Sequence, residues 1–75
     1  MTPEACTKAR ELLGWSRPRL ASFAGCSPDA VMDLEMGRRT PRASTHQAIR
    51  AALEAQGVEF TTDDASGVRL RRQAE

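Results

Sequence analysis

The stretch SRPRLASFAGCSPDAVMDLEMG, residues 16–37, contains two short helix signals in succession. Ser16 and Ser27 each precede a first turn that contains proline, and serine is a preferred N-cap because its hydroxyl accepts hydrogen bonds from free backbone N–H groups. Gly25 and Gly37 follow at positions where a left-handed residue commonly ends a helix. The pattern predicts two short helices of similar length, joined by a tight turn.

Apolar residues in this stretch recur at helical spacing. Leu20, Phe23 and Ala24 are expected to form the buried face of the first helix, and Val31 and Leu34 that of the second. Two capped helices joined by a tight turn have the spacing of a helix-turn-helix unit. In such a unit one helix braces against the DNA backbone, while the N-terminal half of the other enters the major groove. Residues 16–37 therefore predict a DNA-binding function.

Two further helices are predicted on either side of this unit. The first begins at Thr2 and ends at Gly14. Its expected apolar face consists of Cys6, Ala9, Leu12 and Leu13. The other runs from about Ala43 to Gln56 and is followed by Gly57, a typical residue after a helix end. Its expected buried residues are Ala48 or Ile49, together with Ala52 and Leu53.

Beyond Gly57 the hydrophobic period changes from helical to alternating. The apolar and charged residues alternate over 58–60 and over 68–71, on either side of a turn-rich segment at 63–67. This pattern predicts a small C-terminal β-hairpin, so that 1–57 form the helix-turn-helix domain and 58–75 the hairpin and tail. The hairpin either packs on the helices or pairs its open edge with a second copy. Arg69, Arg71 and Arg72 form either a DNA contact or a basic tail.

Length and composition limit the architecture. A chain of 75 residues makes one small domain with an economical core. With 40% hydrophobic residues, no tyrosine and one tryptophan, the composition favours short helices over a sandwich or barrel. The sequence predicts an all-α bundle of four to five short helices with a small C-terminal hairpin. The net charge is only +1, so the partner class must be inferred from where the arginines gather rather than from the total charge.

Several function classes are disfavoured. Cys6 and Cys26 are too few for a disulfide framework and too far apart in sequence for a zinc motif, so buried free thiols are expected. The lone His46 and the scattered serines do not form a catalytic pattern, and no phosphate-binding loop is present. We expect no enzyme activity and no cofactor. No apolar run approaches the ~20 residues of a membrane helix, and the N-terminus lacks a signal-peptide pattern, so a cytoplasmic protein is expected.

Ordered motifs across the chain resemble a known family. Leu12-Leu13-Gly14-Trp15-Ser16, Leu20-Ala21, Ala24-Gly25, Ser27, Val31, Leu34-Glu35, Gly37 and Pro41 are similar to the XRE family of regulators with a lambda-repressor-like fold. The resemblance covers roughly residues 5–57. It implies a domain of four or five helices that binds operator DNA as a homodimer. It also implies an ion pair between Arg10 and Glu35 that ties the first helix to the end of the recognition helix.

The resemblance also assigns DNA contacts residue by residue. Ser27 becomes the cap of a recognition helix over about 27–36. The positions implied for base reading are Pro28, Asp29, Met32 and Asp33. The candidate backbone contacts are Ser16, Arg17 and Arg19 at the start of the preceding helix, and Arg38, Arg39 and Arg42 in the following loop.

The recognition positions depart from the family pattern, which more often has Arg, Gln, Ser or Thr there. Asp29 and Asp33 would face DNA, although an aspartate can accept a hydrogen bond from cytosine N4 and Met32 can contact a thymine methyl group. Phosphate neutralisation supplies most of the affinity of such proteins, so the flanking arginines are expected to carry it. The alternative is a protein-interaction or antitoxin-like module of the same fold, in which Met32 and Met36 meet a protein partner.

Overall fold

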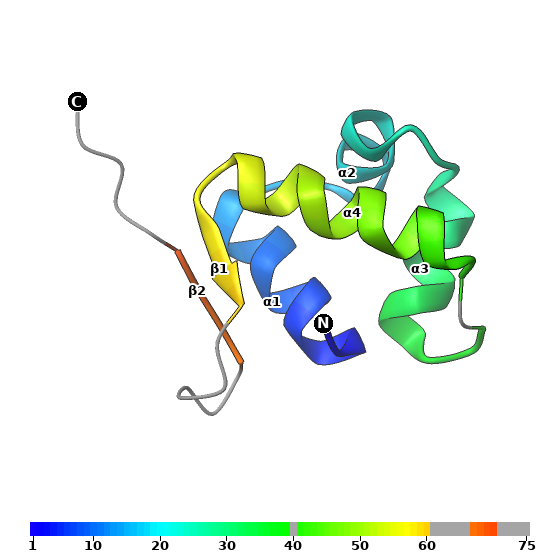
Figure 1. Ribbon diagram of the computed structural model, residues 1–75, viewed down its shortest axis with the longest axis horizontal. Coiled ribbons are helices and arrows are strands. Elements are labelled where there is room, and N and C mark those ends of the chain that lie inside the picture. The colour runs from blue at the N-terminus through cyan, green and yellow to red at the C-terminus, as the bar shows by residue number, and fades with distance from the viewer. Residues whose placement is uncertain (40, 61–66, 71–75) are drawn as a thin grey trace.

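The computed structural model describes residues 1–39, 41–60 and 67–70, which form four helices followed by a two-stranded antiparallel sheet (Figure 1). The helices are α1 (Pro3–Leu13), α2 (Arg17–Ala24), α3 (Pro28–Met36) and α4 (Ala43–Ala55), and the strands are β1 (Val58–Phe60) and β2 (Val68–Leu70). The predicted element order is confirmed, and α4 ends at Ala55, one residue before the expected Gln56.

The first three helices begin and end as their local sequence predicts. Thr2 caps α1, with its hydroxyl accepting from the backbone N–H of Ala5 at 3.1 Å. Gly14, Gly25 and Gly37 follow α1, α2 and α3 with φ of 69°, 74° and 68°. This left-handed conformation carries no steric penalty for glycine and lets the cap N–H bond the last carbonyls of each helix.

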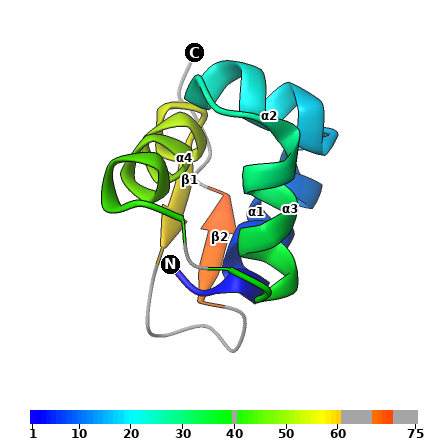
Figure 2. The same ribbon diagram turned by 90° about the vertical axis from the view of Figure 1, so that its right-hand side faces the viewer.

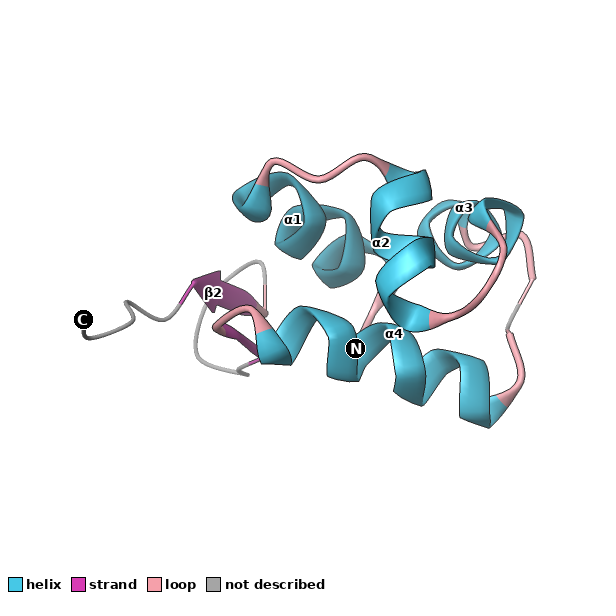
Figure 3. Cartoon of the chain, turned by 90° about the horizontal axis from the view of Figure 1, so that it is seen from above, coloured by secondary structure: helices cyan, strands magenta, loops and turns pink. Residues whose placement is uncertain are grey.

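The helices enclose a single small core that also includes the hairpin. Its fully buried residues are Cys6, Ala9, Leu20, Val31, Ile49 and Leu53. α2 packs against both α3 and α4, while α1 packs against α3 and β2. Figure 2 looks along this arrangement with α3 and α4 on either side and α2 above them. Figure 3 shows the hairpin at one end of the molecule and α3 at the other.

Two residues expected in the core lie at the surface. Leu12 is 38% exposed and Phe23 is 56% exposed, so the prediction of both as core residues is wrong. The ring of Phe23 instead stacks on Trp15, with centroids 4.7 Å apart and planes 7° from parallel. Trp15 itself is half-buried against the core. The Trp15 side chain takes the place that helical periodicity assigned to Phe23.

The C-terminal hairpin packs against the helices. β1 and β2 pair with Val58 opposite Leu70 and Phe60 opposite Val68, which puts the apolar residues on one face. Val58 and Val68 are 2% and 3% exposed and belong to the same core as the helices. Pairing of the hairpin with a second copy stays a prediction. The turn residues 63–66 and the arginines Arg71 and Arg72 lie outside the described residues.

Candidate nucleic-acid interface

α2 and α3 are two short helices joined by a tight turn, as residues 16–37 predicted. The Ser16 hydroxyl accepts from the Arg19 backbone N–H, and the Ser27 hydroxyl accepts from the Ala30 backbone N–H, each at 3.2 Å. Gly25 turns the chain between the helices, and the Cys26 backbone N–H donates to the Ala21 carbonyl at 3.0 Å. The predicted start of the second helix is therefore confirmed, with Pro28 as its first residue.

The outer face of α3 carries the predicted base-reading positions. Pro28 and Asp29 are exposed and Met36 is 60% exposed, whereas Met32 and Asp33 are half-buried. Val31 and Leu34 face the core, as expected. The outer face of the helix is therefore available to a partner along its N-terminal half and at its C-terminal end.

One of the two acids on this face has a cationic partner. The Arg38 guanidinium donates to Asp33 Oδ1 at 3.1 Å, and the Arg38 side chain is 59% exposed. Arg38 therefore offsets the charge of Asp33, and its side chain is still accessible to solvent. Asp29 stands near the N-terminus of α3, where the helix dipole favours a negative charge. Asp29 is thus the acid on this face that has no ion-pair partner among the described residues.

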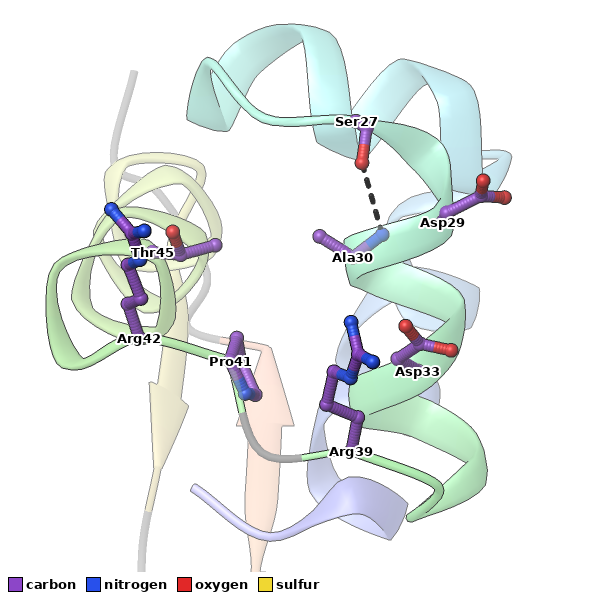
Figure 4. Close-up of a pocket in the computed structure, with 8 residues that line it drawn as sticks. All are labelled: Ser27, Asp29, Ala30, Asp33, Arg39, Pro41, Arg42 and Thr45. Atoms are coloured by element: carbon purple, nitrogen blue, oxygen red, sulfur yellow. Dashed lines mark hydrogen bonds between the residues drawn. The ribbon is translucent and has the colours of Figure 1, made fainter.

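A groove of about 450 Å³ lies between α3 and the start of α4. Its lining residues are Ser27, Asp29, Ala30, Asp33, Arg39, Pro41, Arg42 and Thr45. Figure 4 shows Arg39 beside α3, with Arg42 and Thr45 on the α4 side. The structure thus brings together Ser27, Asp29, Asp33, Arg39 and Arg42 of the candidate set.

Neither groove arginine forms an ion pair within the part of the chain that the structure describes. Both Arg39 and Arg42 are exposed. Among residues 1–39, 41–60 and 67–70, no carboxylate lies within ion-pair distance of either guanidinium. Arg42 also precedes α4 without a side-chain cap bond, so the first N–H groups of that helix are not satisfied by its side chain. The α4 side of the groove is therefore suited to an anion.

Thr45 is a groove residue that the sequence analysis did not single out. It lies in the first turn of α4 and lines the groove together with Arg42. The predicted start of the helix at Ala43 already placed Thr45 in the first turn. The sequence did not predict that α4 packs beside α3, and it is this packing that makes Thr45 a lining residue of the groove.

Arg17 and Arg19 lie on α2, apart from the groove. The Arg17 Nε donates to Glu35 Oε1 at 2.8 Å, and the Arg17 side chain is 34% exposed. Arg19 is exposed, with its guanidinium carbon 5.9 Å from the centroid of the Phe23 ring. Of these two candidate backbone contacts, only Arg19 leaves its guanidinium without a carboxylate partner in the described part of the chain.

Glu35 on α3 is the centre of a buried ionic cluster. Its side chain is 1% exposed and accepts from Arg10 Nε at 2.7 Å and from Arg10 Nη2 at 3.2 Å. The ion pair between Arg10 and Glu35 that the family resemblance implied is therefore present. Burial alone would raise the pKa of Glu35, but hydrogen bonds from Arg10 and Arg17 outweigh burial, so the pKa lies below its ordinary value. The same hydrogen bond to Glu35 raises the pKa of Arg10.

The cysteines are free, and they differ in accessibility. Cys6 is fully buried, and its thiol lies 3.8 Å from Glu35 Oε2. Burial, followed by the charge of Glu35, raises the pKa of Cys6 to about 12. Cys26 is half-buried, and burial raises its pKa as well. The expectation of buried free thiols holds fully for Cys6 and in part for Cys26.

Alkylation by iodoacetamide at pH 8 should therefore modify Cys26 first. The thiolate is the reactive species, so a buried, protonated Cys6 should react at least about tenfold more slowly than Cys26 in the native protein. Peptide mass spectrometry over a time course measures both rates. Cys26→Ser, as a control, should take up its single label slowly when native and rapidly in denaturant. Equal rates for the two native thiols would contradict the burial of Cys6.

The described segments contain neither a metal-binding cluster nor a membrane-spanning helix. Residues 1–39, 41–60 and 67–70 contain no group of three His, Cys, Asp or Glu side chains able to hold a metal ion. Within the same segments, every helix is too short or too polar to cross a membrane. No family model matches the chain, and no curated protein matches it at a significant level. The groove between α3 and α4 gathers five of the candidate residues in one place.

Proposed function

We propose that this chain is a cytoplasmic, sequence-specific regulator of transcription that binds double-stranded DNA through α3. One observation carries the proposal: the accessible N-terminal half of a serine-capped α3 stands beside a groove in which Arg39 and Arg42 have no carboxylate partner within the described residues. The major groove of B-DNA, about 12 Å wide, admits an α-helix. The resemblance to lambda-repressor-like regulators supports the same reading.

The parts of the interface have separate roles in this proposal. Arg39 and Arg42 contact phosphates on one side of α3, and these contacts supply most of the affinity. Asp29 accepts a hydrogen bond from cytosine N4, and Met32 packs against a thymine methyl group. Because Arg38 already pairs with Asp33, Asp29 is the acid on the outer face of α3 whose charge most opposes the approach of the phosphates. No cofactor is needed for any of these contacts.

A homodimer completes the proposal. One α3 reads only a few base pairs, whereas two copies related by a two-fold axis read half-sites about 34 Å apart. The target would then be an approximately palindromic site. Sedimentation of the complex formed with a selected duplex gives the number of chains bound per site.

Selection from a random duplex library, followed by titration at low and high salt, tests the proposed function directly. Enrichment of a common sequence, with affinity that falls steeply as salt rises, is expected for a protein that reads bases and neutralises phosphates. Retention of every duplex alike would limit the function to non-specific binding. No binding even at low salt would remove DNA from the proposal altogether.

Arg39→Ala and Arg42→Ala should each weaken binding to all sequences and flatten the dependence on salt. Loss of one phosphate contact is expected to lower the slope of log affinity against log salt by about 0.9. Lys8→Ala is the control, because Lys8 is an exposed cation on α1 that does not line the groove. Met32→Ala should instead change the preferred sequence and leave the slope unchanged. Equal slopes for Arg39→Ala and the wild type would contradict the phosphate contact.

A second candidate function is a protein-interaction or antitoxin-like module. The exposed Met36, together with the exposed acid Asp29 on the same helix, favours it, because an apolar and acidic surface suits a protein better than a polyanion. A stable partner that covers Met32 and Met36, combined with no affinity for DNA, would support this function. Sequence-specific retention of DNA would decide against it.

A further inference from the structure

The free ends of α2 and α3 are joined by one ion pair. The two helices meet at the turn around Gly25 and diverge from it, with Arg17 at the start of α2 and Glu35 at the last turn of α3. At 1.5 Å per residue, α2 is about 12 Å long and α3 about 13 Å long. α2 and α3 form two sides of a triangle. Its third side consists of the side chains of Arg17 and Glu35, which are joined by a 2.8 Å hydrogen bond between Arg17 Nε and Glu35 Oε1. Because all three sides are held, the angle between the two helices is restrained.

Glu35 itself is held from a third direction by α1. Arg10 donates to both carboxylate oxygens of Glu35, and its Nη1 donates to the Trp15 carbonyl at 2.9 Å in the link between α1 and α2. The carboxylate therefore cannot follow Arg17 toward solvent without breaking its bonds to Arg10. Arg10 thus holds the Glu35 carboxylate in place, and the hydrogen bond from Arg17 to Glu35 links α2 to α3.

The charge of the cluster also argues against a second role for Arg17 at DNA. A phosphate contact by the Arg17 guanidinium would compete with a carboxylate whose side chain is 1% exposed. Moving Arg17 to a phosphate would leave Glu35 with Arg10 as its one cationic partner and remove one of the hydrogen bonds that compensate its burial. Arg39 and Arg42 have no carboxylate partner within the described residues, so a phosphate contact by either of them breaks no ion pair.

We propose that Arg17 is a positioning residue that sets the angle of α3 through Glu35, and that it does not contact DNA phosphate. This inference rests on the proposed function, because the angle matters for the way α3 enters the major groove. It reassigns Arg17 from the backbone contacts that the family resemblance implied. The recognition helix is thus held at its N-terminal end by the turn and at its C-terminal end by the cluster of Arg10, Arg17 and Glu35.

The salt dependence of Arg17→Gln separates positioning from phosphate contact. We expect about a tenfold loss of DNA affinity over all sequences, with the wild-type slope against salt. Arg39→Ala, measured in parallel, should lose slope. In a Glu35→Gln background, Arg17→Gln should cause no further loss, because both variants remove the same connection. A reduced slope for Arg17→Gln, an unchanged affinity, or full additivity with Glu35→Gln would each overturn the proposal.

A measurement without DNA keeps this inference separate from the proposed function. Carbon-detected NMR titration gives the pKa of Glu35 directly, and in Arg17→Gln that pKa should rise because one of its cationic hydrogen bonds is gone. An unchanged pKa would overturn the inference even where DNA binding is lost. If the wild-type chain binds no duplex, the proposed function fails. The NMR titration, together with hydrogen-exchange protection at the end of α3, then decides whether Arg17 holds that helix in place.

Discussion

Replacing Glu35 with glutamine is expected to lower the free energy of unfolding by about 3 kcal/mol, the largest electrostatic effect among the ion pairs of the described residues. The Glu35 side chain is 1% exposed, and Arg10, whose side chain is 13% exposed, bonds both of its oxygens. Glutamine keeps the volume of glutamate but turns an N–H₂ group toward a guanidinium and leaves the charge of Arg10 without a partner. Arg17 contributes less, because its side chain is 34% exposed and water stabilises it after the change.

Urea unfolding followed by circular dichroism measures this loss, with Glu54→Gln as the matched control. Glu54 pairs with Arg50 on the surface of α4 at 3.0 Å, with side chains 43% and 39% exposed, so its replacement should cost less than about 0.5 kcal/mol. A domain of this size has a total stability of roughly 4 to 11 kcal/mol, so the loss at Glu35 is a large share. Similar losses for the two variants would show that the buried cluster contributes no more than a surface pair.

The pH dependence of stability provides a second readout of the same change. The pKa of Glu35 in the folded state lies below its ordinary value of 4.5, so the unfolded chain binds more protons in acid. The contribution of Glu35 is therefore complete above pH 4.5 and is lost as the pH falls through the lower folded pKa. Glu35→Gln should lack this part of the acid sensitivity. An unchanged acid profile in the variant would contradict the lowered pKa.

Leu20→Ala is expected to cost about 3 to 4 kcal/mol, because it removes a fully buried side chain from the centre of the core. Leu20 lies on α2, which packs against both α3 and α4, so the cavity would weaken the support of both helices. Denaturant unfolding at neutral pH gives the value. The midpoint should fall with little change in slope if the native state stays compact.

Leu12→Ala is the matched control for Leu20→Ala, because both changes remove the same atoms. Leu12 is 38% exposed, so its truncation should cost no more than about 1 kcal/mol. The difference between the two variants measures burial rather than residue type. Equal costs would show that Leu12 is covered in solution, for example by a second copy of the chain.

The helix boundaries and the turn could be predicted from sequence because their causes are local. Ser27 caps α3 through a backbone N–H three residues away, and Gly25 takes a left-handed conformation that other residues adopt only with strain. The alternating pattern of 58–60 and 68–70 predicted the hairpin for a similar reason, since each strand turns its apolar residues to one face. Such signals depend on neighbours in the chain and need no knowledge of the fold.

Periodicity failed where a second side chain competed for the same space. The spacing of α2 put Phe23 on the same face as Leu20, but Trp15 occupies the inner position and Phe23 stacks on its outside. The spacing of α1 likewise did not separate Leu12, which is exposed, from Leu13, which packs against the core. A helical pattern gives the direction of a side chain and not the neighbour that it meets.

By itself, the sequence determined the element order, the caps and the core positions on α3, because these follow from residue types within a few positions of one another. Only the tertiary structure decided how the charged residues are used. Arg17 and Arg39 look alike as arginines beside a helix, yet Arg17 is bound to Glu35 and Arg39 lines the groove between α3 and α4. The physical reason is that an ion pair depends on the distance in space between two side chains. The packing of α1 and α4 against α2 and α3 sets these distances.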